Sequence, residues 1–314
     1  MFVIGIEFID FLCPYAAGVI CVDVIKMTSI CHPFVHLTLV IMTVLIAGLC
    51  ISSCSAGHEK KEAQFRVMTA NIGHCSLFER PSVQDWVDVL GDGPKADVLL
   101  LQDVQSQGQV QDLAGRLGYT YWITDPAARP GGSDLAVLTT SEIQRSHYLG
   151  FEASPTDKGA LCAQVMLAGC EALVCSVHLD RVEPTPQIKD GQVDFPWLQL
   201  IAEMFYEVFT PTVRSQSAGE LVHWLDDLEC KRIVVGGDFN TVPPSRAVRV
   251  MSRHFDDALW PSWDFFQGTY KPFDFPLKPR IDYLFHSPSL ECLYSSIHEA
   301  TAGDHFPVWA EFGF

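Results

Sequence analysis

An apolar strand in this chain runs directly into a Gly-Gly-Asp-Phe-Asn sequence, at Val234–Asn240 (VVGGDFN). Because side chains at positions i and i+2 of a strand lie on the same face, we expect Asp238 and Asn240 to project together from the strand's carboxyl end. The two glycines allow the backbone to approach a neighbouring element or a ligand closely. One carboxylate beside one amide suits a site that binds a cation and an oxyanion. The alternative is structural, because Asp and Asn also cap turns and helices.

The length and composition indicate a folded protein with an acidic surface. The 314 residues are enough for one large domain or two small ones, and 48% of them are hydrophobic. The formal net charge is -17, and an acidic surface repels polyanions at long range. The charge therefore argues against a protein that coats nucleic acid non-specifically, but it is compatible with an enzyme that has a local cationic or metal-binding cleft.

The first part of the chain has the features of a targeting segment. No Asp, Glu, Lys or Arg occurs between Met27 and His58, and the apolar run Leu37–Ile51 lies within this stretch. A bilayer span needs about 20 residues. The run has 15, which is the length of a signal-peptide core. The residues before Cys54 resemble a bacterial lipoprotein signal, in which that cysteine is lipidated. The alternative is a signal anchor that is never cleaved.

These features divide the chain into three parts. We expect residues 1–54 to form a signal peptide or membrane anchor, with Met27 as an alternative start, and residues 55–64 to form a polar tether. Residues 65–314 form the folded domain. This domain would work outside the cytoplasm, either in the cell envelope with the N-terminal segment as its contact with the membrane, or after secretion. We expect it to be a monomer.

The cysteines suggest two readings. Six of the eleven follow Cys54, and an even number in an oxidising compartment allows one or more disulfides. None of them shows the C-x-x-C spacing of a metal site. Because Cys162, Cys175 and Cys292 lie in apolar strand-like runs, we expect them to be small buried residues.

Strand-like and helix-like segments alternate from Gln64 onward, without an internal repeat or a low-complexity linker. This pattern predicts one α/β domain of about 250 residues. The predicted strands are 65–72, 97–101, 119–124, 135–139, 160–167, 172–178, 232–236, 281–285, 291–298 and 308–312. The predicted helices are 83–90, 110–117 and, with an interruption near Pro211, 195–209 and 218–228. We expect Asp180–Phe195 to be a long loop without regular structure.

Polar side chains of metal-binding or acid–base type occur where the predicted strands begin or end. Ligands of layered α/β proteins collect at such ends. Folding alone gives little reason for so many polar residues at these positions. They are Asn71, Asp103, His178, Asp238, Asn240, Asp282, Asp304 and His305.

Six segments follow one another along the chain: TANIGH, LLLQDV, VHLD, GGDFNTVP, RIDYLF and GDHFPVWAEF. With these segments, the stretch 65–314 resembles the endonuclease/exonuclease/phosphatase superfamily, which has the DNase I-like fold. The resemblance implies an α/β (α+β) four-layer αββα sandwich, in which two central mixed β-sheets lie face to face and are flanked by helices. It also implies hydrolysis of phosphoester bonds with Mg²⁺ or Mn²⁺ as cofactor.

The resemblance assigns metal binding to three residues. Asp103 occupies the position of the principal ligand, Asn71 lies beside it, and Asp304 is close enough to help. Mg²⁺ bound by one or two carboxylates and by the substrate phosphate suits this sparse set. The family pattern is Gln-Glu where this chain has Gln102-Asp103. The shorter side chain implies a weaker metal site or a shifted strand, and we expect activity to survive. Asp134, where members often have Asn, is expected to begin a strand.

The same resemblance assigns catalytic roles to five residues. Asp238 would orient or deprotonate the attacking water, and Asn240 would donate a hydrogen bond to a phosphoryl oxygen as charge develops. His305 would contact the phosphate or accept a proton, with its tautomer held by Asp282. His178 would contact the phosphate or protonate the leaving oxygen. The metal and these donors would stabilise an in-line attack on phosphorus electrostatically.

Three functions are compatible with these residues. The first is a metal-dependent hydrolase that acts outside the cytoplasm on a small phosphodiester or a phospholipid head group. The second is a secreted nuclease, which would need a basic groove; the acidic charge disfavours nucleic acid as the partner. The third is a binding protein that keeps the fold without catalysis, and Asp103 is the only residue that argues for it.

Overall fold

The computed structural model describes residues 65–73, 80–126, 134–181, 187–189, 192–194, 202–203, 206–259, 268–271 and 278–314. Contacts within the chain divide it into Met1–Glu59 and Lys60–Phe314, and all described residues belong to the second unit. The expected signal segment, Cys54 and the whole tether at residues 55–64 lie outside the described part of the chain. No helix among the described residues is long and apolar enough to cross a membrane.

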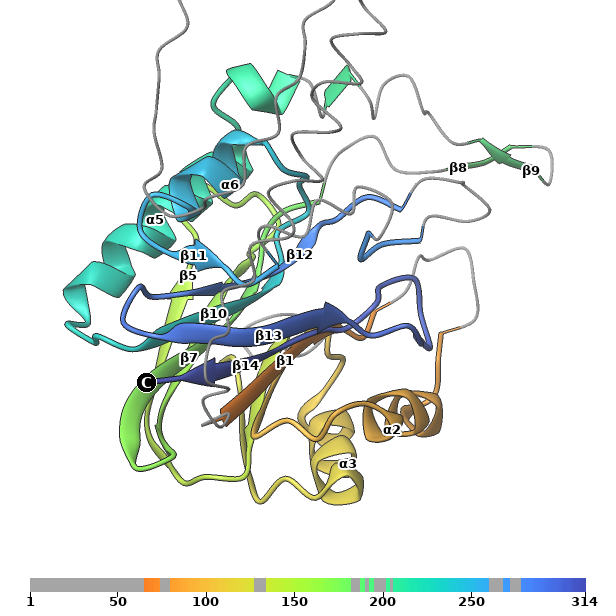
Figure 1. The fold of residues 1–314 in the computed structure, drawn as a ribbon. Coiled ribbons are helices and arrows are strands. Elements are labelled where there is room, and N and C mark those ends of the chain that lie inside the picture. The colour runs from red at the N-terminus through yellow and green to blue at the C-terminus, as the bar shows by residue number, and fades with distance from the viewer. Residues whose placement is uncertain are drawn as a thin grey trace, which may run out of the picture. The chain divides into compact units, whose positions relative to one another are not determined.

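Two six-stranded sheets form the centre of the domain (Figure 1). Across the first sheet the strands are β13 (Glu291–Ile297), β14 (Val308–Gly313), β1 (Phe65–Asn71), β2 (Val98–Gln102), β4 (Leu135–Thr139) and β3 (Tyr121–Thr124). Across the second sheet they are β11 (Asp256–Asp257), β12 (Asp282–His286), β10 (Ile233–Asp238), β7 (Cys170–His178), β6 (Gly159–Leu167) and β5 (Ile143–Gly150). Both sheets are mixed, because β1 is parallel to β2 and β10 is parallel to β7, whereas the other pairs described are antiparallel.

Helices cover the outer faces of the two sheets. Buried residues of both sheets, among them Leu100 and Val234, form one apolar cluster between them. Helices α2 (Val83–Asp92) and α3 (Gln107–Leu117) pack with the first sheet in a second cluster. Helices α5 (Val213–Asp227) and α6 (Arg246–Met251) pack with the second sheet in a third (Figure 1). The predicted four-layer αββα sandwich is confirmed.

Polar residues before the helices explain where they begin. Ser82 and Asp85 form a capping box at the start of α2, and Thr212 and Ser215 form one at the start of α5. Each box satisfies backbone N–H groups that the first helical turn leaves without partners. The predicted start of the second helix at residue 218 is therefore wrong, because the cap at Thr212 begins the helix earlier.

Strands also occur where the sequence predicted none. The side chains of β5 are half-buried or exposed, and β5 lies at the edge of its sheet, so it lacks a clear apolar pattern. The expectation that Asp180–Phe195 has no regular structure is wrong, because β8 (Gln187–Lys189) and β9 (Gln192–Asp194) form an antiparallel hairpin. The sequence pair Asp190-Gly191 between these strands is a typical hairpin signal.

A disulfide joins β6 to β7. Cys162 and Cys175 pair directly in the register of these antiparallel strands, and both are fully buried. Both residues are buried as expected, and they form one of the disulfides that the even number of cysteines allowed, because the register places the two side chains next to each other. Cys292 is a half-buried free thiol.

Two glycines bring β10 close to its neighbours. A Cβ atom on Gly236 would lie 2.8 Å from Cδ1 of Leu100 in the facing sheet, and a Cβ atom on Gly237 would lie 1.8 Å from the carbonyl oxygen of Val177 in β7. Only glycine fits at such distances. The close approach expected from VVGGDFN is therefore present, and it holds the end of β10 against both β7 and the first sheet.

Candidate active site

Strand register brings the predicted catalytic residues together at the end of β10. Asp238 is the last residue of this strand, and it pairs with His178 of parallel β7 on one side and with Asp282 of antiparallel β12 on the other. In the first sheet, Asn71 ends β1 and pairs with Gln102 at the end of parallel β2. The carboxyl ends of parallel strands are where ligands collect in open α/β sheets.

A buried network connects the two sheets next to this edge. Nε2 of Gln102 donates a hydrogen bond to Oγ of Ser176 in the other sheet, at 2.9 Å, and Oγ of Ser176 donates to the carbonyl oxygen of Leu101 at 2.8 Å. Gln102 precedes Asp103, and Ser176 lies two residues before His178. The network therefore fixes the separation between two predicted site residues that belong to different sheets.

Asp238 is buried between two histidines. Its Oδ2 atom lies 3.6 Å from Nε2 of His178 and 3.8 Å from Nε2 of His305, and it accepts a hydrogen bond from Nδ2 of Asn71 at 2.9 Å. Burial raises the pKa of Asp238 to about 6, although the attraction of the two histidines opposes this shift. A carboxylate whose pKa lies near neutrality suits a proton acceptor.

Asn240 lies beyond the strand rather than on it. Because β10 ends at Asp238, the expected alternation of side chains along a strand does not apply to Asn240, which has a positive φ of 50°. Its backbone N–H instead donates to Oδ1 of Asp238 at 2.8 Å, and its Nδ2 donates to the carbonyl oxygen of Leu179 at 2.9 Å. Asn tolerates this left-handed conformation better than most residues. The turn keeps the amide beside the carboxylate.

His305 is held by a second carboxylate. Its Nδ1 atom lies 3.1 and 3.0 Å from the two oxygens of Asp282, and its ring packs against Tyr270, with 4.8 Å between the ring centroids. Burial alone would lower the pKa of His305, but Asp282 and Asp238 outweigh it and raise this pKa to about 10. This raised pKa favours the imidazolium form of His305 at neutral pH, with Nε2 facing Asp238.

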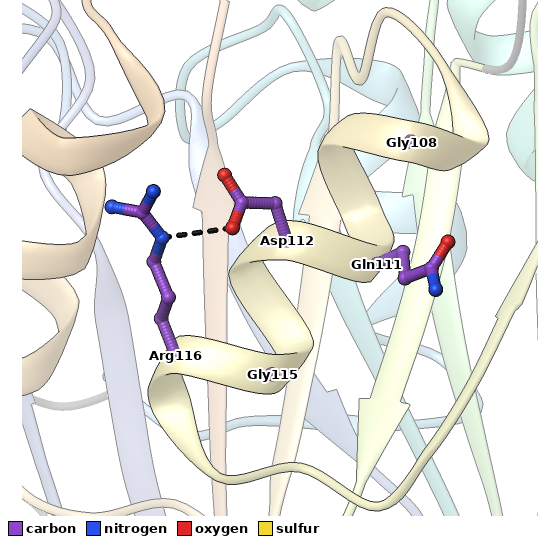
Figure 2. A pocket seen from close by; sticks show the side chains of 5 residues that line it. All are labelled: Gly108, Gln111, Asp112, Gly115 and Arg116. Atoms are coloured by element: carbon purple, nitrogen blue, oxygen red, sulfur yellow. Dashed lines mark hydrogen bonds and ion pairs between the residues drawn. The ribbon is translucent and has the colours of Figure 1, made fainter.

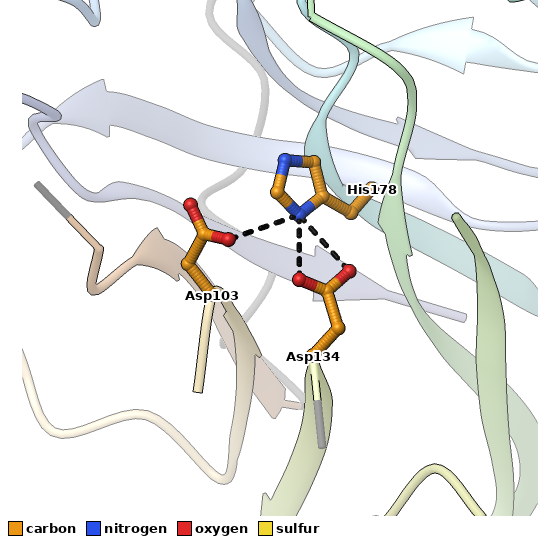
Figure 3. Close-up of side chains that lie close together, drawn as sticks. All are labelled: Asp103, Asp134 and His178. Carbon is orange, nitrogen blue, oxygen red and sulfur yellow. Dashed lines mark hydrogen bonds and ion pairs between the residues drawn. The ribbon is translucent and has the colours of Figure 1, made fainter. Parts of the chain in front are cut away.

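His178 is held in a similar way by Asp134 and a lysine. Its Nδ1 atom lies 3.1 Å from Oδ2 of Asp134, 2.9 Å from Nζ of Lys158 and 3.8 Å from Oδ1 of Asp103. Figure 3 shows the two carboxylates and the imidazole pointing toward one another. Burial would lower the pKa of His178, but Asp134 and Asp103 outweigh it and raise this pKa, against the opposing charge of Lys158.

Asp134 does more than begin a strand. Its Oδ1 atom lies 3.0 Å from Nζ of Lys158. Burial would raise the pKa of Asp134, but His178 and Lys158 hold it well below its usual range. Lys158 was not predicted from the sequence, because no recognised motif surrounds it. It reaches the site because β6 begins at Gly159, which pairs with His178 in the register of β6 and β7.

The surroundings of Asp103 fit a divalent metal ion. The side chain of Asp103 is 40% exposed, and its Oδ2 atom lies so close to Gly73 that a Cβ atom there would be 2.5 Å away. The N–H of Gly73 donates to Oδ1 of Asn71 at 2.8 Å, which brings an amide oxygen to the same side. Carboxylate and amide oxygens are hard ligands of the kind that Mg²⁺ binds. Asp103 and Asn71 are thus suitably placed, and their role as ligands stays a prediction.

Two groups of side chains among the described residues have donor atoms within 4.8 Å of one another. Asp304 belongs to neither, and its backbone carbonyl accepts a hydrogen bond from the N–H of Lys271 at 2.8 Å. Its predicted help with the metal stays a prediction. The groups are Asp103, Asp134 and His178, and Asp238, Asp282 and His305.

A buried ion pair secures the loops that follow His178 and Asn240. Nε of Arg214 lies 2.7 Å from Oε1 of Glu207, and its Nη1 donates to the carbonyl oxygens of Asp180 and Arg181 at 3.2 and 3.1 Å. Oε2 of Glu207 accepts a hydrogen bond from Oγ1 of Thr241. The pair thus fixes backbone next to both functional loops without contacting the catalytic side chains that are described.

A hollow on α3 lies apart from these residues. It has a volume of about 380 Å³ and is lined by Gly108, Gln111, Asp112, Gly115 and Arg116, all of one helix (Figure 2). Its two charged side chains form an exposed ion pair with each other, at 2.8 Å. It contains none of the predicted site residues, so it gives no alternative to the site at the end of β10.

Comparison with known proteins agrees with this geometry. The model of the Endonuclease/Exonuclease/phosphatase family matches residues 68–305, which is most of the chain. The chain belongs to this family. The endonuclease/exonuclease/phosphatase fold is that of phosphoesterases, and in this chain it presents acidic and histidine groups able to bind a metal.

Solved structures show the same fold at low sequence identity. D. rerio TDP2 humanized by 14 mutations is 13% identical with a TM-score of 0.59, and the match covers 80% of this chain and 99% of that one. The endonuclease/exonuclease/phosphatase from Bacteroides vulgatus is 19% identical with a TM-score of 0.56, covering 80% and 98%. The human Nocturnin catalytic domain with bound sulfate is 18% identical with a TM-score of 0.57, covering 80% and 94%. No curated protein sequence matches significantly.

Proposed function

We propose that this endonuclease/exonuclease/phosphatase protein is a Mg²⁺- or Mn²⁺-dependent phosphodiesterase that acts outside the cytoplasm on a small phosphodiester or a phospholipid head group. The observation that carries the proposal is the position of Asp238. Its carboxylate lies between Nε2 of His178 and Nε2 of His305, and each histidine has a further carboxylate, Asp134 or Asp282, at its other ring nitrogen. This arrangement supplies one proton acceptor and two imidazoles whose protonated forms are stabilised.

Each residue has a defined part in the reaction. Asp238, ionised above its pKa of about 6, accepts a proton from water as the water oxygen forms a bond to phosphorus. Imidazolium His305 donates a hydrogen bond to a non-bridging oxygen, whose negative charge grows in the transition state. As the bond to the leaving oxygen breaks, His178 donates a proton to that oxygen.

The remaining residues position the substrate and the cation. Asn240 uses one N–H of its amide on the carbonyl oxygen of Leu179, and the amide's second N–H is the donor for a phosphoryl oxygen. Asp103 and Asn71 would hold the metal. When bound, the metal supplies Lewis-acid polarisation of the phosphoryl group. Asp103 is one methylene shorter than the family's Glu. Its Oδ2 atom lies against Gly73, whose N–H donates a hydrogen bond to Oδ1 of Asn71.

The location and substrate class rest on other observations. The buried disulfide between Cys162 and Cys175 is typical of proteins in oxidising compartments. The apolar run Leu37–Ile51 supports export or anchoring at a membrane. The net charge of -17 disfavours a long polyanionic substrate, because repulsion at a distance slows its approach. A small diester or a zwitterionic lipid head group is not repelled in this way.

The test is hydrolysis by the purified full-length protein of a chromogenic phosphodiester and the matching monoester, with Mg²⁺, with Mn²⁺ and with excess EDTA. Single-stranded DNA and phosphatidylcholine vesicles are further substrates. We expect turnover of the diester that exceeds that of the monoester, that EDTA abolishes and that Mn²⁺ restores. Hydrolysis of DNA in preference to the small diester and the lipid would favour a nuclease instead. No turnover of any substrate would contradict the proposal.

A further inference from the structure

Lys158 has a largely buried side chain, and hydrogen bonds fasten the loop that carries it. It lies immediately before β6, and its side chain is only 15% exposed. Its backbone N–H donates to Oγ of Ser154 at 2.9 Å, and Oγ of Ser154 donates to Oδ1 of Asp180 at 3.1 Å. Thr156 also donates to this oxygen of Asp180. Asp180 lies two residues after His178, so the loop that carries Lys158 is fastened to the segment that carries the histidine.

The ammonium group of Lys158 contacts every member of one cluster of metal-binding type. Its Nζ atom lies 2.9 Å from Nδ1 of His178, 3.0 Å from Oδ1 of Asp134 and 3.7 Å from Oδ1 of Asp103. The donor atoms of these three residues lie within 4.8 Å of one another (Figure 3). The cluster therefore already contains one positive charge, supplied by the chain itself.

The other cluster is different in charge. Among the described residues, no lysine or arginine forms an ion pair within 4.0 Å of Asp238 or Asp282, and His305 is the cation that Asp282 holds. Both oxygens of Asp238 also accept hydrogen bonds, from Asn71 and from the backbone of Asn240. Of the two clusters, only that of Asp103, Asp134 and His178 therefore has a lysine of the described residues in contact with it.

We propose that Lys158 takes the place of a second divalent cation in the cluster of Asp103, Asp134 and His178, so that the centre holds one metal ion. This inference rests on the proposed function, because it specifies how many metal ions that same site binds. The two oxygens of Asp103 face different neighbours. Oδ1 faces Lys158 and His178, whereas Oδ2 lies against Gly73 on the side of Asn71. We therefore expect the single metal ion to bind at Oδ2 of Asp103, on the side of Asn71.

The physical reason is competition between cations for the same donor atoms. An ammonium group is a compact charge with three donors, and here its Nζ atom lies 3.0 Å from Oδ1 of Asp134 and 2.9 Å from Nδ1 of His178. A divalent ion would have to strip those contacts and bind beside a fixed positive charge in a largely buried cluster, where repulsion between like charges is weakly screened. Removing the ammonium without removing its volume would take away the fixed positive charge that repels a second ion from this cluster.

The test is calorimetric titration of Mn²⁺ into metal-stripped full-length protein. The variants are Lys158→Met, which keeps the side-chain length without the charge, and Lys158→Arg, which keeps the charge. Lys231→Met removes an exposed lysine elsewhere and controls for the change in net charge. Circular dichroism would establish that each variant is folded, and Lys158→Gln replaces the Met variant if the latter does not fold.

We expect one Mn²⁺ per chain for the wild type, Lys158→Arg and Lys231→Met, and two for Lys158→Met or Lys158→Gln. Equal stoichiometry of one in all variants would overturn the inference about Lys158 and leave the proposed function intact. A second ion in the Lys231 variant as well would also overturn it, because the gain would then follow net charge. If neither the wild type nor the Lys158 variants bind Mn²⁺, both the inference and the proposed metal dependence fail.

Discussion

His178 and His305 both approach the same oxygen atom, Oδ2 of Asp238, with their Nε2 atoms at 3.6 and 3.8 Å. The two histidines are held by different sheets: His178 is the last residue of β7 in the second sheet, and His305 lies shortly before β14 in the first. Each has a carboxylate at Nδ1, Asp134 for one and Asp282 for the other. The buried Asp238 is thus flanked by two imidazoles that favour their protonated forms, and this relationship determines how the site should respond to pH and mutation.

The plot of hydrolysis rate against pH should have an acidic limb, where the rate rises with pH, and an alkaline limb, where it falls. Asp238 must be ionised to accept a proton, and burial raises its pKa to about 6, so turnover should rise as the pH increases through 6. His305 must be protonated to stabilise the phosphoryl group and His178 to protonate the leaving oxygen; because the pKa of His178 is raised and that of His305 is about 10, turnover should fall at alkaline pH, at the latest as the pH approaches 10. Initial rates at saturating metal, measured from pH 4.5 to 10.5, check both limbs.

The alkaline limb can be assigned by mutation. Asp282→Asn removes the carboxylate that contributes most to keeping His305 protonated, so this limb should move to lower pH while the acidic limb moves less. Asp256→Asn, an exposed residue of the neighbouring strand β11, is the control and should leave both limbs unchanged. An alkaline limb that stays in place in Asp282→Asn would show that His305 is not responsible for it.

Two substitutions of Asn240 distinguish the strain of its backbone conformation from the chemical role of its amide. Asn240→Ala loses the amide and places a residue with a Cβ at a positive φ of 50°, whereas Asn240→Gly loses the amide without that strain. If the amide stabilises developing charge, both variants should lose about 100- to 1000-fold in kcat. Thermal melting should show Asn240→Gly to be the more stable of the two. Recovery of activity in Asn240→Gly would mean that the residue serves only the turn.

The metal affinity should depend on the charge of Asp103. Asp103→Asn keeps the size of the side chain and removes its charge, so we expect Mn²⁺ affinity to fall at least about tenfold. Asp103→Glu restores the family residue and should retain binding, although its positive φ of 56° suits Glu less well than Asp. Calorimetry compares the two directly. Unchanged affinity in Asp103→Asn would remove Asp103 from the ligand set.

The ion pair between Glu207 and Arg214 should matter far more than a surface pair. Arg214→Ala leaves the buried carboxylate of Glu207 without its cation, and such losses cost about 3–5 kcal/mol of unfolding free energy. Arg116→Ala breaks the exposed pair with Asp112, whose side chains are 44% and 45% exposed, and should cost less than about 1 kcal/mol. Urea denaturation of both variants gives the comparison. A similar loss of unfolding free energy in the two variants would mean that the ion pair between Glu207 and Arg214 does not stabilise the domain.

The disulfide should contribute to stability as well as indicate the compartment. Replacing both Cys162 and Cys175 by Ala removes a cross-link between residues 13 apart, and we expect a loss of about 2–4 kcal/mol. Cys170→Ala, a half-buried free thiol, is the control. Mass spectrometry of the unreduced protein should identify the peptide pair linked through Cys162 and Cys175. Free thiols at both positions in protein from its native compartment would contradict an oxidising location.

The sequence was sufficient for most strands of the two sheets and for the polar residues near their ends, and the family resemblance supplied the four layers. Apolar runs such as 135–139 predict strands because both of their faces are buried, and motifs such as VVGGDFN put functional residues at strand ends. It was insufficient for Lys158, because the contact of this residue with His178 depends on the pairing of Gly159 with His178 across two strands. Register of this kind is set by the whole hairpin and leaves no local pattern.

Other differences have similar causes. Asn240 follows the end of β10 in a left-handed turn, so strand alternation could not place it. Glu207 and Arg214 occur in a segment where helix signals are interrupted, and their importance depends on carbonyl groups at Asp180 and Arg181 that are distant in sequence. β5 is an edge strand whose residues are all half-buried or exposed, so the hydrophobic pattern that reveals strands is absent.

The most direct test of the proposed mechanism is the turnover of a chromogenic phosphodiester by Asp238→Asn beside Asp227→Asn, an exposed residue at the end of α5. Both substitutions remove one carboxylate and leave the size of the side chain nearly unchanged. We predict that Asp238→Asn retains its fold and loses about 100- to 10,000-fold in kcat, whereas Asp227→Asn keeps the wild-type rate. Full activity in a folded Asp238→Asn protein would contradict the assignment of the active site to the end of β10.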